Sequence, residues 1–164
     1  MTAWPLEKQE RLVDVEISLV AFGLRVPQVL GGRWRVVRGK TTDAEQLALW
    51  QKGRELPGEA CTTESPLGRT VTNAKDCSET AHGLRQYGAC AVDFVAMTDA
   101  GELDWTPARY LALGKLAKGL GFEWGGDFKI MRRGKMVSMG DYGHVQVKGW
   151  RSISLRQTPE VGNV

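Results

Sequence analysis

The segment ACAVDFVA at residues 89–96 constrains the fold of this chain most, because it is an apolar run interrupted only by Asp93. A short apolar run of this kind predicts a buried β-strand. Side chains alternate between the two faces of a strand, which puts Asp93 on the same face as Ala91 and Val95. A carboxylate in such surroundings is costly to desolvate unless it is paired or bound to a cation. We therefore expect Asp93 to have a charged partner or a metal ion.

Other periodic segments predict strands and helices around this strand. Alternating side chains predict strands at Arg33–Arg38 and His144–Lys148. Apolar residues at helical spacing predict an N-terminal helix at about residues 6–24. Thr42 or Asp43 suits the N-cap of a second helix.

A third helix is predicted where Thr106 precedes Pro107, because proline is favoured at the first helical position. The segment Glu55–Glu79 between the second helix and the central strand is rich in Gly, Pro, Ser and Thr, which indicates a long ordered loop. We expect the third helix to turn three leucines inward: Leu111, Leu116 and Leu120.

Length and composition fit one soluble domain spanning residues 1–164, and we expect a monomer. The formal charge of +3 is a mild excess, and the basic residues are dispersed without repeated aromatic partners, so nucleic-acid binding is not expected. No run of about 18 apolar residues predicts a membrane span. The N-terminus is charged where a signal peptide needs an apolar core, so we expect synthesis in a cytoplasm without a signal peptide.

The chain has two histidines, His82 and His144, and they suggest a metal site with Asp93. Zinc in hydrolases often takes two histidines and one carboxylate, with water in the fourth position. The metal lowers the pKa of that water and polarises the scissile carbonyl. A second carboxylate must then move the proton to the leaving amine. Asp141, three residues before His144, suits that role.

Plainer interpretations remain open for each of these residues. A lone histidine is more often a core or surface residue than a ligand, and Asp141 stands in a glycine-flanked segment typical of a turn. Asp93 could pair with an arginine. The odd number of cysteines argues against a disulfide framework. A zinc site through Cys77 and His82 would lack a further partner at standard spacing.

The motifs resemble a family of zinc peptidases that includes VanY-type D-Ala-D-Ala carboxypeptidases and the L-alanyl-D-glutamate endopeptidases of phage endolysins. Its pattern S-x-H-x-x-G-x-A-x-D is matched by Thr80-Ala81-His82 and Ala91-Val92-Asp93. Its later D/E-x-x-H is matched by Asp141-Tyr142-Gly143-His144.

Three further segments carry the same resemblance, which covers about residues 36–147. Trp124-Gly125-Gly126-Asp127-Phe128 is similar to the family's W-G-G-D-W/F. The segment AEQLALWQKGRELPG, which contains Gln46, is similar to Q-x-x-L-x-x-x-G-R-x-x-x-G. Arg69–Ala74 is similar to the V-T-N-A stretch.

The resemblance implies a small α+β fold of the Hedgehog/D-Ala-D-Ala peptidase type, with a central antiparallel sheet, packed helices and a catalytic core at about residues 36–150. It implies Zn²⁺ as the cofactor and Asp141 as the general base. The implied zinc ligands are His82, Asp93 and His144, and the implied site-shaping residues are Thr80, Trp124, Asp127, Gln46 and Arg38.

The sequence departs from the family pattern in three places. The interval from His82 to Asp93 is four residues longer, which predicts a bulge or turn within residues 83–89. Thr80 replaces the usual serine. Thr41 stands where the family has an arginine, so we expect Lys40 or Arg38 to supply that charge.

The expected function is a zinc-dependent peptidoglycan peptidase of the endolysin type, which hydrolyses the L-Ala–D-Glu bond of the cell-wall peptide stem. Such a protein would be held in the cytoplasm of the infected host before release to the periplasm and wall. Two alternatives stay open: a D-Ala-D-Ala carboxypeptidase, which shares the metal site, and a non-catalytic wall-binding zinc domain.

Overall fold

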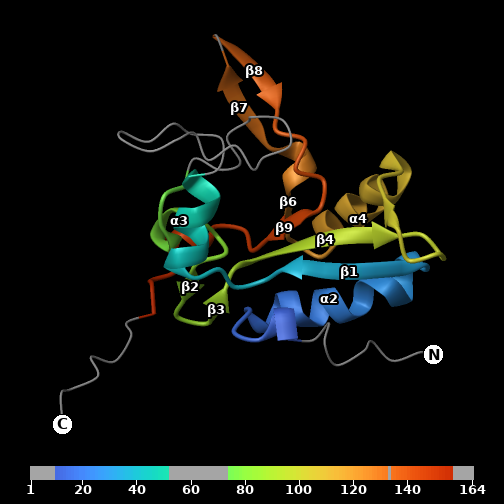
Figure 1. Ribbon diagram of the computed structural model, residues 1–164, viewed down its shortest axis with the longest axis horizontal. Coiled ribbons are helices and arrows are strands. Elements are labelled where there is room, and N and C mark those ends of the chain that lie inside the picture. Colours follow the sequence, from blue (N-terminus) through green and yellow to red (C-terminus); the bar gives the residue numbers. More distant parts are fainter. Residues whose placement is uncertain (1–9, 52–73, 133, 157–164) are drawn as a thin grey trace.

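The computed structural model describes residues 10–51, 74–132 and 134–156 (Figure 1). A central sheet brings together four strands that neighbour one another in the order β1, β4, β9, β6, and every pair in this order is antiparallel. A short fifth strand also pairs antiparallel with β4. The strands of this sheet are β1 (Arg33–Arg38), β4 (Ala91–Met97), β5 (Leu103–Asp104), β6 (Glu123–Trp124) and β9 (His144–Gln146).

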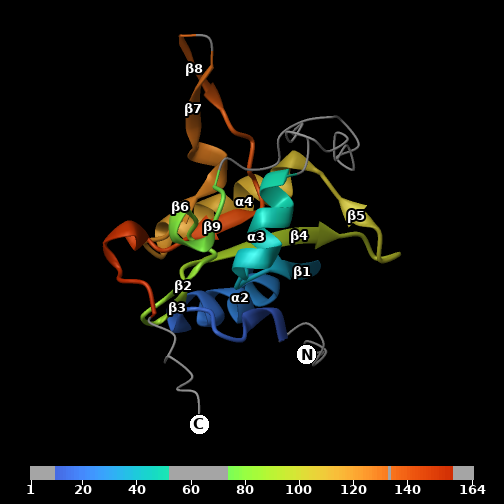
Figure 2. The ribbon, with the colours of Figure 1, turned by 60° about the vertical axis from the view of Figure 1, so that its left-hand side comes forward.

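Two hairpins lie outside the central sheet. One pairs β2 (Leu84–Arg85) with β3 (Gly88–Ala89) just before β4. The other pairs β7 (Lys129–Arg132) with β8 (Lys135–Ser138) and projects away from the sheet in both views (Figures 1 and 2). Four short 3-10 helices complete the described elements: Glu10–Leu12, Cys77–Glu79, Gly125–Asp127 and Trp150–Ser152.

The main core lies between one face of the sheet and two helices, α2 (Ile17–Leu30) and α4 (Pro107–Gly119). Alternation along β4 directs Val92 and Phe94 into this core, where Phe94 meets the ring of Phe22 from α2 edge to face. Asp93 therefore faces away from α2 and α4, on the opposite face of the sheet. The apolar run of residues 89–96 does form a buried strand, as its composition predicts.

Helix α2 lies further along the chain than the helix expected at about residues 6–24. The Glu16 carboxylate accepts a hydrogen bond from the Ser18 amide and so caps the helix at that point. The buried positions Leu19, Phe22 and Val26 continue one apolar stripe past residue 24 onto the sheet. The helix consequently includes Pro27 and ends at Leu30.

Helix α3 (Asp43–Gln51) stands near the end of β1 and the start of β4 (Figure 1). Thr42 and Glu45 form a reciprocal cap, because the Glu45 carboxylate accepts from the Thr42 amide at 2.8 Å and the Thr42 hydroxyl accepts from the Glu45 amide at 3.3 Å. The predicted helix start at Thr42 or Asp43 is confirmed.

Helix α4 begins at Pro107 as predicted, but the expectation that Leu111 and Leu120 point inward is wrong. Both are exposed, at 58% and 43% respectively. The buried stripe of the helix instead follows Tyr110, Leu113 and Ala117, at helical spacings of three and four residues. Leu116 is half-buried against this core.

A glycine in α4 allows close packing against β6. A Cβ atom on Gly114 would lie 2.3 Å from the Trp124 ring, so any side chain there would force the ring to move.

Overall the described residues form a mixed α and β structure with antiparallel sheets, compatible with the expected α+β class. Among them, no helix is long and apolar enough to cross a membrane.

Candidate metal centre

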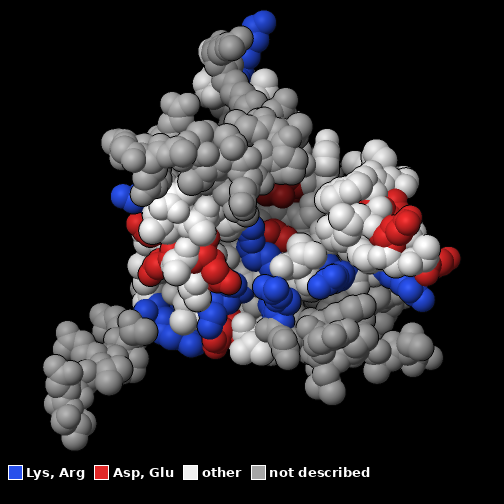
Figure 3. Space-filling view, viewed as in Figure 1, with Lys and Arg blue, Asp and Glu red and all other residues white. Residues whose placement is uncertain are grey.

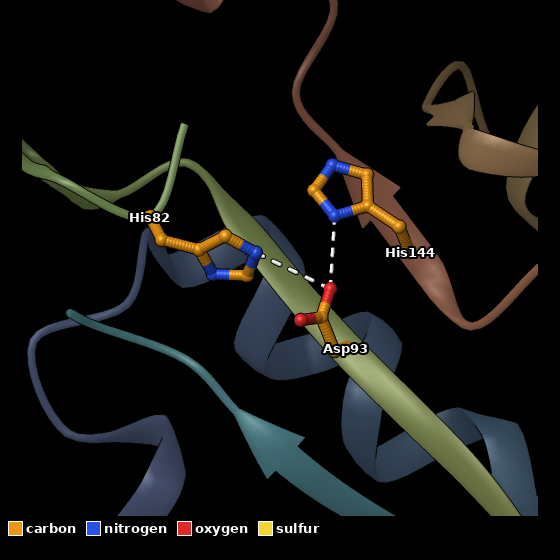
Figure 4. A group of neighbouring side chains, drawn as sticks. All are labelled: His82, Asp93 and His144. Atoms are coloured by element: carbon orange, nitrogen blue, oxygen red, sulfur yellow. Dashed lines mark hydrogen bonds and ion pairs between the residues drawn. The ribbon is translucent and has the colours of Figure 1, made fainter. Parts of the chain in front are cut away.

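The centre is built on the register between β4 and β9. Asp93 on β4 stands directly opposite His144 on β9, so the two side chains lie on the same face of the sheet. His82 precedes the β2–β3 hairpin, and its amide donates to the Thr80 hydroxyl at 3.3 Å. Figure 4 shows both imidazoles directed at the carboxylate of Asp93.

The three side chains form one compact cluster. Asp93 Oδ1 lies 2.8 Å from His144 Nδ1 and 3.2 Å from His82 Nε2. One ligand atom from each residue lies within 4.8 Å of the other two, and the histidines are only 4% and 7% exposed. Three ligands around a tetrahedral zinc ion would be about 3.3 Å apart, so this cluster could hold such an ion after small adjustments.

Neighbouring groups fix which nitrogen of each imidazole carries a proton. His82 Nδ1 lies 2.7 Å from the carbonyl oxygen of Gly39, which can only accept a hydrogen bond, so Nδ1 carries the proton. His144 Nε2 lies 2.9 Å from Oε1 of Gln146. The amide group of Gln146 donates to the Glu123 carboxylate at 2.6 Å, which turns its oxygen toward His144. His144 Nε2 is therefore also a donor.

Both rings consequently direct their remaining nitrogen, with its lone pair, at Asp93 Oδ1. Three electron-pair donors without a cation between them repel one another. Protons or a metal ion remove that repulsion, and a metal ion is the better match because both rings have already placed a proton on the far nitrogen. The arrangement of donors therefore fits a divalent cation on physical grounds.

The pKa values of Asp93 and His144 also indicate that positive charge stabilises the cluster. Burial by itself would raise the pKa of Asp93, but the two imidazoles hold it well below its usual range. Burial would lower the pKa of His144, yet the hydrogen bond and charge of Asp93 raise it overall. A bound metal ion would replace these protons.

Gly39, Gln146 and Glu123 were not identified from the sequence. A signal was available for Gln146, because it stands two residues after His144 and so shares its face of β9. Nothing local indicated Glu123, which reaches Gln146 because β6 pairs with β9 opposite that residue.

Asp141 lies beside the cluster without joining it. Its Oδ2 atom is 4.0 Å from His144 Nδ1, and its side chain is 50% exposed. The desolvating surroundings raise the pKa of Asp141, against the charge of His144, which lowers it. The turn that holds Asp141 is anchored by Trp124, whose indole N–H donates to the carbonyl of Tyr142 at 2.8 Å.

The structure distinguishes the two basic residues expected to replace the family arginine. The register of β1 against β4 shifts between Val36 and Arg38, and this irregularity sets Arg38 opposite Asp93. Arg38 Nε lies 3.6 Å from Asp93 Oδ2. Lys40 instead pairs with Asp14 at 2.8 Å, away from the cluster. Thr41 is buried, and its amide donates to the carbonyl of His82.

The remaining expected site residues lie at varied distances from the cluster. Gln46 is buried and donates to the carbonyl of Ala74 at 2.7 Å, which ties α3 to the segment before His82. Asp127 pairs with Lys118 at the surface and does not contact the ligands.

The four additional residues between His82 and Asp93 are accommodated by the β2–β3 hairpin, which confirms the turn predicted within residues 83–89. Cys77 lies outside the candidate metal group found among the described residues, and its thiol donates to the carbonyl of Thr41. Cys90 is buried, whereas Cys61 and residues 69–73 lie outside the described part of the chain.

A cavity of about 470 Å³ opens beside the cluster. Its lining includes Asp93 and Asp141, and also Leu111 and Trp105, which follows Asp104 opposite Ala96, three residues further along β4 than Asp93. Figure 3 shows acidic atoms within a recess on this face and basic side chains over β1 beside it. A ligand in the cavity would therefore touch both the candidate metal centre and an apolar wall.

Comparisons with known proteins add evidence on the fold. No family model matches this chain, and no curated protein matches it. Among solved structures, the chain is similar to the Serratia marcescens L-Ala D-Glu endopeptidase ChiX, with a TM-score of 0.55, 21% sequence identity and coverage of 88% of each chain. At this level of identity the similarity shows that the two proteins share a fold over most of their length.

Proposed function

We propose that this protein is a zinc-dependent peptidoglycan peptidase that hydrolyses the L-Ala–D-Glu bond of the cell-wall peptide stem. The observation that carries the proposal is the convergence of His82, Asp93 and His144 lone pairs beside an open cavity that also holds Asp141. The shared fold with a protein described as an L-Ala D-Glu endopeptidase supports the choice of substrate.

In this proposal the zinc ligands are His82 Nε2, Asp93 Oδ1 and His144 Nδ1. A zinc ion held there would supply Lewis-acid activation of a water molecule and of the scissile carbonyl. Asp141 then accepts the proton of the attacking water and donates it to the amine of the departing D-Glu residue. Its exposed position lets it reach both atoms, and its raised pKa makes it a stronger base than an ordinary aspartate.

Arg38 has a separate role in the proposal. Its guanidinium lies beside the Asp93 carboxylate, and its side chain is 34% exposed. It would orient Asp93 and donate hydrogen bonds to the oxygen that gains negative charge during attack. In this assignment Arg38 supplies the positive charge that the resembled family places, as an arginine, at the position of Thr41.

Digestion of purified peptidoglycan tests the proposal. Mass spectrometry of the products is expected to show new L-Ala carboxyl ends and new D-Glu amino ends. Release of free D-alanine alone would instead support a D-Ala-D-Ala carboxypeptidase. Asp141→Ala is expected to keep about one zinc per chain and to lose hydrolysis, whereas Asp99→Ala, at an exposed aspartate between β4 and β5, keeps both.

If wild-type protein binds zinc and cleaves no stem peptide, a wall-binding zinc domain becomes the better assignment.

The proposal also includes the endolysin role, with the protein kept in the cytoplasm of the infected host until it reaches the periplasm. Expression in a bacterial host with and without a membrane-permeabilising partner tests that role, and lysis is expected only with the partner.

A further inference from the structure

The far end of the cavity presents an aromatic face held in a fixed orientation. The Trp105 ring stacks on Tyr110 with the planes 11° apart and the centroids 5.9 Å apart. Tyr110 is itself buried, accepts a hydrogen bond from the Ala96 amide, and meets the Trp34 ring edge to face. Trp105 nevertheless remains 66% exposed. Its outer face is therefore available to a ligand without rearrangement.

The cavity is apolar at this end. Leu111, which the buried stripe of α4 leaves exposed, lies in the same wall as Trp105, and Val37 is also exposed there. The described residues lining the cavity include no Lys, Arg or His. The nearest basic residues of β1 are Arg35, opposite Val95, and Arg38, beside Asp93, and neither belongs to that lining.

The apolar wall at Trp105 and Leu111 favours the half of the substrate that carries no charge. On one side of the L-Ala–D-Glu bond the stem carries carboxylates, which would be costly to desolvate against that wall. On the other side, L-Ala is joined by an amide to the lactyl group of N-acetylmuramic acid. That sugar is uncharged once the amide has formed, and its C–H faces and methyl groups suit an aromatic wall.

We propose that the Trp105 end of the cavity is a subsite for the N-acetylmuramyl sugar that carries the stem peptide. The inference rests on the proposed function, because it requires the scissile bond to follow L-Ala. A sugar stacked on Trp105 would place the L-Ala carbonyl toward Asp93 and Asp141 at the other end of the same cavity. The enzyme would then prefer stems still attached to glycan over free peptides.

Two matched substrates test the subsite: N-acetylmuramyl-L-Ala-D-Glu-diaminopimelate and N-acetyl-L-Ala-D-Glu-diaminopimelate. Wild-type enzyme is expected to show a KM about fivefold to tenfold lower for the muramyl substrate, the size expected of one aromatic contact. Trp105→Ala is expected to bring the two KM values within about twofold of each other, and Trp105→Phe to restore part of the preference. Tyr87→Ala is the control, because Tyr87 is 64% exposed and does not line the cavity.

The outcomes separate this inference from the proposed function. Cleavage of both substrates with equal KM by wild-type enzyme would overturn the sugar subsite and leave the peptidase assignment intact. An equal rise in both KM values in Trp105→Ala would also overturn it, because the peptide would then occupy the wall. Failure to cleave either substrate would overturn both. A thermal melt of each variant confirms that it is folded.

Discussion

Asp93 and His144 lie opposite each other on adjacent antiparallel strands, with Asp93 Oδ1 2.8 Å from His144 Nδ1. His144 is buried and Asp93 is half-buried on its strand, and the Asp93 carboxylate could not remain there at low energetic cost without a charged partner or a cation. His82 completes the cluster from a separate segment. The predictions below follow from this pairing and from the contacts that support it.

Metal binding is expected to stabilise the folded protein and to require Asp93. Zinc at about 100 times its dissociation constant should stabilise the wild-type fold by about 2.7 kcal/mol, because the unfolded chain lacks the assembled site. Asp93→Asn should abolish this effect by removing the anionic ligand. Thermal melts with zinc or a chelator measure it, with Asp99→Asn as the control. An undiminished zinc response in Asp93→Asn would contradict the ligand assignment.

Gln146 is expected to set the zinc affinity without touching the metal. Gln146→Leu removes the acceptor for His144 Nε2–H, so the ring can rotate or change tautomer. We expect zinc affinity to fall about 10-fold to 100-fold, as for other groups that orient metal-bound histidines. Competition with a chromogenic chelator measures the affinity. Gln146→Glu keeps an acceptor and should bind zinc more tightly than Gln146→Leu. Equal affinities in wild type and Gln146→Leu would rule out this role.

Arg38 and Lys40 are expected to behave differently although both are basic and two residues apart. Arg38→Ala should lower kcat about 100-fold to 1000-fold if its guanidinium stabilises the developing oxyanion. Lys40→Ala should affect kcat little, because Lys40 pairs with Asp14 at the surface. Steady-state kinetics on a muramyl-peptide substrate compare the two. A larger loss in Lys40→Ala than in Arg38→Ala would reverse the assignment.

Two glycines of α4 provide a matched test of the packing that supports the site. Gly114→Ala should destabilise the fold by about 1–3 kcal/mol, because the new methyl group collides with the Trp124 ring. Gly119→Ala should be neutral or should stabilise by up to about 1 kcal/mol, since no heavy atom lies within 4 Å of its Cβ position and alanine favours the helix. Urea denaturation measures both. Equal stability changes would argue against the close approach of α4 and β6.

Much of the local structure could be predicted because its signals are local. The strand Arg33–Arg38 follows from alternation and is confirmed over the predicted range. The apolar run around Asp93 identifies a buried strand and marks its carboxylate as exceptional. The face of helix α4 that points into the core was harder to predict. The sequence predicts Leu111 inward, whereas the packing of Tyr110 and Leu113 turns it toward the cavity.

The sequence by itself determined the available ligands, because the chain has two histidines and an aspartate in an apolar strand. Only the tertiary structure decided how they meet: the register that pairs Asp93 with His144, the Gly39 carbonyl and Gln146 that orient the rings, and the irregularity in β1 that selects Arg38 over Lys40. Those relationships depend on strand pairing between distant segments. Local periodicity records which side of a strand a residue occupies, but not which residue lies opposite it.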